Sequence, residues 1–199
     1  MMYSQNDEEA RIAKYFGDYV GRFLDIGAND GVTLSNTHAL ALRNWSGVCV
    51  EPSPSAFARL CATYAELPDI QCINAAIGSY SGAMTLHESG EHLGRGDVAL
   101  LSTLVDAERL RWNREEFRAV SVRVDLYDEL LGGMRFDLIS IDAEGMDLAI
   151  FQQINLTEAD CSMCIVEVNS GDARPFIAHA AKHGLNVSHR NAENLIFAR

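Results

Sequence analysis

Basic residues are scarce in this sequence of 199 residues, in which 16 lysines and arginines stand against 28 aspartates and glutamates. The formal net charge is -12, and the arginines are scattered along the chain rather than gathered in one patch. An acidic surface repels the phosphate backbone of DNA and RNA at long range, so the composition argues against general affinity for nucleic acid. We therefore expect no nucleic-acid partner.

Long hydrophobic runs are also missing. No stretch approaches the ~20 consecutive apolar residues that a membrane-spanning helix needs. The chain starts with MMYSQNDEEARIAKYF, which carries acids where a secretory signal has a basic start followed by an apolar run. We therefore expect a cytoplasmic protein with no membrane partner.

Cysteine occurs five times, an odd number, and its spacing does not indicate a metal site. Cys49, Cys72 and Cys164 lie in apolar runs that are typical of strands, where buried free thiols are common. Cys161 and Cys164 form one C-x-x-C pair, but no second pair stands at zinc-finger spacing. The thiols therefore give no support to a metal or redox role.

Hydrophobic residues make up 48% of the chain, which is enough for one domain with a substantial core over residues 1–199. Strand-like and helix-like segments alternate, which predicts a mainly parallel sheet with helices on both faces. The expected helices span residues 6–17, 35–44, 53–67, 105–117, 146–154 and 173–183. The expected strands of the main sheet span residues 22–26, 47–52, 70–78, 136–142 and 163–169, followed by 185–190 and 194–199.

The end of the chain predicts a distinctive topology. LNVSHR and NLIFAR are joined by the short segment NAE, so we expect a hairpin that adds an antiparallel strand to the parallel sheet. Short strands near 83–87 and 120–124 are then accessory, and seven strands remain in a Rossmann-like, doubly wound sheet. Between the accessory strands, residues 88–118 show no regular hydrophobic periodicity and are expected to form a substrate loop or lid.

The segment FLDIGANDG, residues 23–31, combines an apolar strand-like run with two glycines. This pattern predicts a buried strand that ends in a tight turn opening a helix, as in nucleotide-binding α/β folds. The dinucleotide fingerprint G-x-G-x-x-G is incomplete, because Asn29 stands where the middle glycine lets the backbone approach a pyrophosphate. A cofactor without phosphates therefore fits better.

Acidic residues follow the ends of several predicted strands, where ligands of open α/β sheets bind. Glu51 stands 24 residues after Gly27, at the end of the second strand, and is placed to bind ribose hydroxyls. The charge of Asp25, Glu51 and Asp142 also suits a cationic sulfonium better than a pyrophosphate. Together these residues favour S-adenosylmethionine, although each alone has a simpler explanation as a tight turn, a solvated acid or a helix cap.

Segments along nearly the whole chain resemble, in order and spacing, the FkbM family of S-adenosylmethionine-dependent methyltransferases. The resemblance depends most on DIGANDG combined with IDAEG. The matching segments are YSQNDEEARIAKYF, FLDIGANDGVTLSNT, GVCVEPSPSAFARL, INAAIG, STL, FDLISIDAEGMDLAIFQQI and NLIFAR. Two positions depart from the family pattern: Asp7 stands where glycine is common, and Ser140 where a lysine often precedes the ID pair.

The resemblance implies a class I methyltransferase fold and O-methylation of a hydroxyl on a sugar or a small natural product. By position, the turn after the first strand would surround the methionine part, Glu51 the ribose, and residues 74–77 the adenine edge. The residues expected to bind S-adenosylmethionine are Asp25, Gly27, Ala28, Asn29, Gly31, Glu51, Pro52, Asn74, Ala75, Ala76 and Asp142. The expected acceptor is a small molecule or a carbohydrate, with specificity in residues 88–118 and in the N-terminal helical segment 1–20.

Candidate catalytic residues follow the fourth and fifth strands. A hydroxyl becomes a good nucleophile when a positioned base takes its proton. Asp142 and Glu144 alternate on one side of an extended strand end, and Glu167 and Asn169 follow the next strand. We expect Glu144 first and Glu167 second to act as the base or hydroxyl anchor, with Asp142 beside them. Helix capping by Glu144 and turn support by Glu167 are the structural alternatives.

Other chemistries stay open or are excluded by the same residues. The carboxylates could instead hold a Mg²⁺ ion, and His38, His87 and His92 are further candidate bases. Methylation of DNA bases is excluded, because no proline precedes a cysteine or directly follows Asp142. A non-catalytic binding module and an NAD-dependent oxidoreductase remain as alternative functions, and the sequence gives no indication of oligomeric state.

Overall fold

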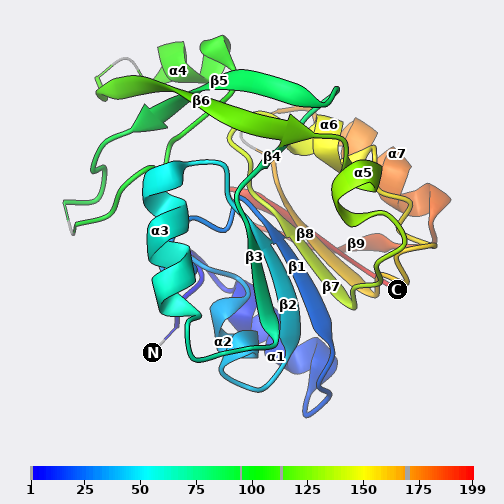
Figure 1. Ribbon diagram of the computed structural model, residues 1–199. Coiled ribbons are helices and arrows are strands. Elements are labelled where there is room, and N and C mark those ends of the chain that lie inside the picture. The colour runs from blue at the N-terminus through cyan, green and yellow to red at the C-terminus, as the bar shows by residue number, and fades with distance from the viewer. Residues whose placement is uncertain (1, 95, 113, 169–170) are drawn as a thin grey trace.

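The computed structural model describes residues 2–94, 96–112, 114–168 and 171–199. A central sheet of seven strands runs through the molecule with helices on both of its faces (Figure 1). In order across the sheet, the strands are β3 (Ile70–Ile73), β2 (Ser46–Val50), β1 (Arg22–Ile26), β7 (Leu138–Ile141), β8 (Met163–Glu167), β10 (Asn194–Ala198) and β9 (Asn186–Arg190).

The pairing of these strands confirms the predicted topology. The strands from β3 to β8 pair in parallel with their neighbours. β10 instead runs antiparallel to both β8 and β9, as the expected C-terminal hairpin requires. The sheet is therefore the seven-stranded, doubly wound sheet with an antiparallel C-terminal strand that defines class I methyltransferases.

Side chains of the buried strands alternate between two hydrophobic clusters, one on each face of the sheet. In β1, Leu24 and Ile26 pack on one face and Phe23 on the other. The first face is covered by helices α5 (Tyr127–Leu131), α6 (Asp147–Phe151) and α7 (Arg174–Lys182). The second is covered by α1 (Glu8–Phe16), α2 (His38–Ala41) and α3 (Pro54–Thr63). Burial on both sides explains why these strands read as nearly continuous apolar runs.

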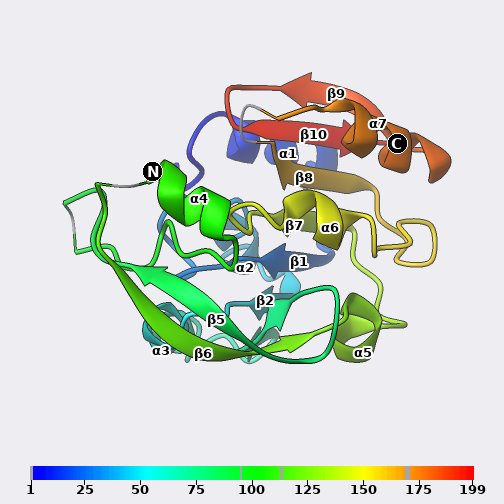
Figure 2. The ribbon, with the colours of Figure 1, turned by 90° about the horizontal axis from the view of Figure 1, so that it is seen from above.

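A second sheet covers the carboxyl ends of the central strands (Figures 1 and 2). It consists of β4 (Ala76–Ile77), β6 (Phe117–Asp125) and β5 (Gly82–Ser89), and the short helix α4 (Asp106–Arg111) lies between β5 and β6 in the chain. The accessory strands expected near 83–87 and 120–124 are thus real and pair with each other.

Several expected elements differ from the structure, among them the helix expected over 35–44, which is only α2. The strand predicted over residues 70–78 is broken after Ile73, because the Asn74 amide donates to the carbonyl oxygens of Glu51 and Pro52, at 2.7 and 3.2 Å, and the chain then joins β6 instead. The helix expected over 105–117 is only the short α4. Asn169, expected to follow the fifth strand, lies outside the described residues. Within the described part of the chain, no helix is long and apolar enough to cross a membrane.

Candidate active site

A cavity of about 310 Å³ opens at the carboxyl ends of β1, β2, β7 and β8. Its floor is the turn after β1. Its outer wall comes from β5, from residues 92–94 and 96–104 (the covering segment), and from the end of α4. This is the edge of the sheet where open α/β folds bind their ligands. The candidate site therefore begins with the residues that close the turn after β1.

Gly27 is the residue of this turn that admits no side chain. Its φ is +83°, and a Cβ placed on it would lie 1.7 Å from the carbonyl oxygen of Asp142. Asn29 also has a positive φ, +47°, and its side-chain amide donates to the Val98 carbonyl at 3.0 Å. The turn is therefore pressed against the end of β7 on one side and tied to the covering segment on the other.

Two residues predicted to bind the cofactor do not line the cavity. Gly31 has a φ of +78°, and a Cβ on it would come within 2.7 Å of the Tyr64 ring and 2.8 Å of Leu60, so this glycine lets the turn pack closely on α3 and the residues after it. Asn74 holds the backbone after β2 through its bonds to Glu51 and Pro52. Both residues therefore help to shape the site without lining the cavity themselves. The other nine predicted residues all line the cavity: Asp25, Gly27, Ala28, Asn29, Glu51, Pro52, Ala75, Ala76 and Asp142.

Glu51 is fixed at the end of β2 by two backbone amides. Its Oε2 accepts from Asn29 N at 2.9 Å, and its Oε1 accepts from Ser53 N at 2.7 Å. The side chain is buried, and this burial raises the pKa of Glu51 to about 7 despite the two N–H donors. Each carboxylate oxygen can accept a further hydrogen bond, so the side chain is oriented to receive hydroxyl donors from a ligand.

Asp25 lies deeper, beneath the turn. Its Oδ2 accepts a 2.6 Å hydrogen bond from the hydroxyl of Thr37, and burial raises the pKa of Asp25 to about 6. The sequence analysis did not single out Thr37. A buried acid at a strand end needs such a donor. The hydroxyl residues just beyond the glycine turn could have indicated in the sequence where this donor comes from.

Three carboxylates meet at the ends of β7 and β8, as the sequence predicted from their positions. Asp142, Glu144 and Glu167 each offer one oxygen, and the three oxygens lie within 4.8 Å of one another. The Asp142 and Glu167 carboxylates are therefore close enough to interact directly. Burial raises the pKa of Asp142 and of Glu144, and the neighbouring acids raise both further.

The loop that carries Glu144 is held in a strained shape by residues that the sequence analysis missed. Glu144 has a φ of +45°, unusual for a residue with a side chain. The buried Asp147 carboxylate accepts from Ala143 N at 2.7 Å and from Gly145 N at 3.0 Å, and the Thr103 hydroxyl donates to the Glu144 carbonyl at 2.6 Å. Asp147 follows the IDAEG segment closely, but only the closed loop shows that it binds these two amides.

The three candidate histidines differ in position. His92 lines the cavity, with its ring 5.5 Å from that of Trp112. His87 pairs with Asp106 at 3.1 Å, and His38 packs against the Tyr3 ring at 4.5 Å; neither lines the cavity. Ser140, where a lysine is common in the family, accepts a hydrogen bond from the Asn36 side chain at 3.1 Å.

These features fit S-adenosylmethionine. At Gly27 the absence of a side chain lets a ligand approach the backbone closely. Glu51 offers acceptors for ribose hydroxyls, and a small apolar wall suited to adenine is formed by Ala75, Ala76 and Ile77. Asp25 and Asp142 supply negative charge near a sulfonium. The strand order of the sheet and the arrangement of this site are together those of the class I methyltransferases.

Comparison with protein families narrows this class. The model described as the methyltransferase FkbM domain matches residues 25–189. The chain therefore belongs to the FkbM family of S-adenosylmethionine-dependent methyltransferases. No curated protein matched the sequence.

Solved structures support the fold at low sequence identity. Methyltransferase FkbM from Methylobacillus flagellatus is 11% identical, with a TM-score of 0.59 over 90% of this chain and 44% of that one. A putative RNA methyltransferase from Pyrococcus horikoshii is 14% identical, with a TM-score of 0.53 over 97% and 83% of the two chains. Monomeric WbdD is 12% identical, with a TM-score of 0.52 over 98% and 41%. The chain thus spans less than half the length of the Methylobacillus protein.

Proposed function

We propose that this protein transfers a methyl group from S-adenosylmethionine to a hydroxyl of a sugar or a small natural product. The observation that carries the proposal is the group of three carboxylates at one end of the cavity, next to the glycine turn. This arrangement places candidate bases beside the residues that fit the cofactor. An oxygen nucleophile needs such a base, because a neutral hydroxyl is a poor nucleophile until its proton leaves.

The cofactor would be held by Gly27 and Asn29 at the turn, by Glu51 at its ribose and by residues 75–77 at its adenine. When bound, it supplies an electrophilic methyl group on a cationic sulfur. The protein aligns the acceptor oxygen and excludes water, and alignment alone lowers the barrier for an in-line displacement. Leu101 and Leu104, which line the cavity from the covering segment, supply the apolar cover for this role.

The proton that leaves the acceptor hydroxyl would be shared by the three carboxylates rather than held by one residue. Three carboxylates this close repel one another, so the group retains at least one proton until the pH rises above the ordinary range of acids. Because the charge of Asp142 raises the pKa of Glu144, a single microscopic pKa does not describe the base. Glu144 remains the first candidate base and Glu167 the second, with Asp142 beside both of them.

A Mg²⁺ ion is the second candidate for activating the hydroxyl. The three carboxylate oxygens lie close enough to ligate one ion, and oxygen ligands suit magnesium. A bound cation would lower the pKa of the hydroxyl by its charge. Methyl transfer that disappears with a chelator and returns with Mg²⁺ favours this variant, whereas transfer unaffected by the chelator favours the carboxylate base.

The proposed function is tested in two stages. Calorimetry with S-adenosylhomocysteine should show binding to the folded protein, and the absence of heat would favour the non-catalytic module. The protein is then incubated with S-adenosylmethionine and a lysate metabolite extract, and mass spectrometry should find a product heavier by one methyl group on oxygen. Methylation found only on nitrogen or carbon would contradict the proposal.

A further inference from the structure

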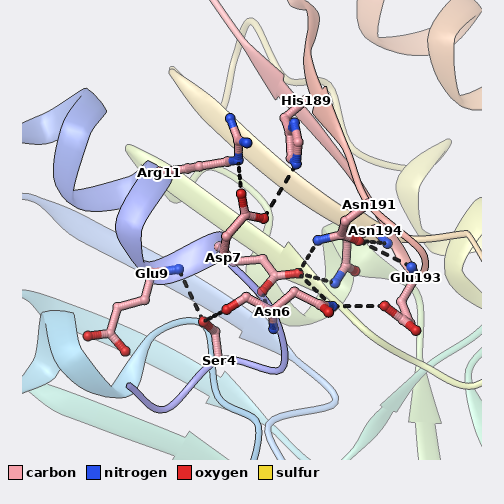
Figure 3. Close-up of polar contacts among 10 residues, drawn as sticks. Ser4, Asn6, Asp7, Glu9, Arg11, His189, Asn191, Glu193 and Asn194 are labelled. Atoms are coloured by element: carbon pink, nitrogen blue, oxygen red, sulfur yellow. Dashed lines mark hydrogen bonds and ion pairs between the residues drawn. The ribbon is translucent and has the colours of Figure 1, made fainter. Parts of the chain in front are cut away.

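The segment before α1 crosses to the cavity and is fixed at both of its ends. On one side, the buried Ser4 forms a parallel bridge with Leu34, in the loop after β1. On the other, the Asn6 side-chain amide donates to Glu193 Oε2 at 2.8 Å, in the turn between β9 and β10 (Figure 3). Residues 4–6 therefore form a strap, the N-terminal strap, between two loops that border the site.

The strap is held by a buried carboxylate at the start of α1. Glu8 is fully buried; its Oε1 accepts from the side chains of Asn191 at 2.6 Å and Asn194 at 2.8 Å, and its Oε2 from Asn6 N at 2.9 Å. Burial opposes the charge, but these N–H donors outweigh it and lower the pKa of Glu8. Figure 3 shows Asn191 and Asn194 gathered beside the strap. The position of the strap is thus fixed by hydrogen bonds rather than by apolar packing.

Gln5, in the middle of the strap, lines the cavity together with Glu193. Its backbone neighbours on both sides are fixed, whereas its own side chain is exposed and has no hydrogen-bond partner among the described residues. Glu193 is adjacent to Asn194, which pairs with Glu167 across the sheet, and the Glu193 carbonyl accepts from Val168 N at 2.7 Å. Gln5 and Glu193 therefore border the candidate catalytic end of the cavity.

We propose that Gln5 and Glu193 bind the hydroxyl groups of a neutral carbohydrate acceptor. This inference rests on the proposed function and names its substrate class and a specificity-determining residue. A carboxamide can donate and accept, and a carboxylate accepts, so the pair matches hydroxyls, which do both. Glu167 and Glu193 at this end repel an anionic acceptor such as a uronic acid. The strap gives the amide a fixed position, which reduces the entropy lost on binding.

The test measures binding directly and does not need turnover. The protein is loaded with S-adenosylhomocysteine, and saturation-transfer NMR follows methyl α-D-glucopyranoside, methyl α-D-galactopyranoside, methyl α-L-rhamnopyranoside and sodium glucuronate. We expect at least one neutral glycoside to bind and glucuronate to give no signal. Gln5→Leu should raise the Kd of that glycoside at least fivefold, with Gln5→Asn between it and the wild type. Gln71→Leu, an exposed glutamine on β3 away from the cavity, is the matched control and should stay within twofold.

The outcomes separate this inference from the proposed function. If the protein does not bind S-adenosylhomocysteine, the proposed function fails and this inference with it. If it binds S-adenosylhomocysteine but no neutral glycoside, or if Gln5→Leu leaves the glycoside Kd unchanged, only the carbohydrate site is overturned. The affinity for S-adenosylhomocysteine should be the same in Gln5→Leu and the wild type.

Discussion

Gly27 and Asp142 touch through their backbones. The Cβ of any larger residue at position 27 would lie 1.7 Å from the Asp142 carbonyl oxygen, and Asp142 N donates to Ile26 O at 2.9 Å. The turn that fits the cofactor and the loop that carries the acids are therefore in direct contact. A change in one must move the other.

Gly27→Ala should strongly weaken binding of S-adenosylhomocysteine, because the added methyl group must displace the end of β7 or the turn itself. Calorimetry should show at least a tenfold rise in Kd, together with a lower Tm. Gly133→Ala is the matched control: Gly133 has a similar φ, +78°, but nothing lies within 4 Å of its added Cβ. The control should lose only the ~1–2 kcal/mol of a left-handed alanine. Equal affinity in both variants would show that the turn does not bind the cofactor.

Glu51→Ala should weaken S-adenosylhomocysteine binding by about 1–3 kcal/mol, the cost of losing charge-assisted hydrogen bonds to the ribose. The variant also frees Asn29 N and Ser53 N, so a lower Tm should accompany the weaker binding. Calorimetry on the folded variant measures the first effect, and thermal unfolding the second. Glu66→Ala, an exposed acid outside the cavity, is the control. Unchanged affinity in Glu51→Ala would remove this residue from the ribose site.

The main sheet could be predicted because its signals are local. The run RFLDI places alternating apolar residues on two faces, and a short NAE connection can only join neighbouring strands. The break after Ile73 could not be predicted, because it depends on Asn74 reaching the carbonyl oxygens of a different strand end. The apolar pattern of the sequence continues past residue 73, so the pattern alone predicts an unbroken strand.

The site residues that stand at strand ends could be predicted from the sequence. The residues that act by holding a folded loop could not. Glu51 and Asp142 end buried strands, so their place at the cavity could be read from the chain. Thr103 and Asp147 bind backbone groups of the loop at residues 143–145, and those bonds exist only in the folded loop. Gln5 reaches the cavity because its neighbours Ser4 and Asn6 contact Leu34 and Glu193, which are distant in sequence.

Asp147→Ala should destabilise the protein by about 1–3 kcal/mol, because the Ala143 and Gly145 amides lose their acceptor. The loop that presents Glu144 then relaxes, so kcat should fall as well. Thermal unfolding and methyl transfer measure the two effects. Thr103→Val tests the same loop from the opposite side, since it removes the bond to the Glu144 carbonyl together with the acceptor of Val105 N. Full activity in both variants would show that the strained loop is not needed.

Glu144→Gln should lower kcat at least tenfold while the affinity for S-adenosylhomocysteine changes less than twofold. The amide keeps the size of the side chain but cannot take a proton, and positioned bases contribute about 10²–10⁴-fold. Glu167→Gln should give a smaller loss, as the second candidate. If both variants lose affinity and turnover equally, the residues support the structure rather than the reaction.

The stability of the unliganded protein should fall as the pH rises from 7 to 9. Burial raises the pKa of Glu51 to about 7, and burial and neighbouring acids raise the pKa of Glu144. In the unfolded chain these groups lose their protons near pH 4. The native state therefore holds more protons above that pH, and its stability decreases as the pH rises through the raised pKa values. Burial lowers the pKa of His38, His179 and His183, so in this window they are mostly neutral in both states.

Glu144→Gln removes one of these protons, so its Tm should fall less between pH 7 and 9 than the wild-type Tm does. The exposed Glu158 does not line the cavity, and Glu158→Gln should keep the wild-type slope. Thermal unfolding at several pH values with constant ionic strength provides the comparison. Adding S-adenosylmethionine, whose sulfonium favours the ionised acids, should reduce the wild-type slope as well. Parallel Tm curves for Glu144→Gln and the wild type would mean that Glu144 is already ionised at pH 7, which would contradict the repulsion argued from its neighbours.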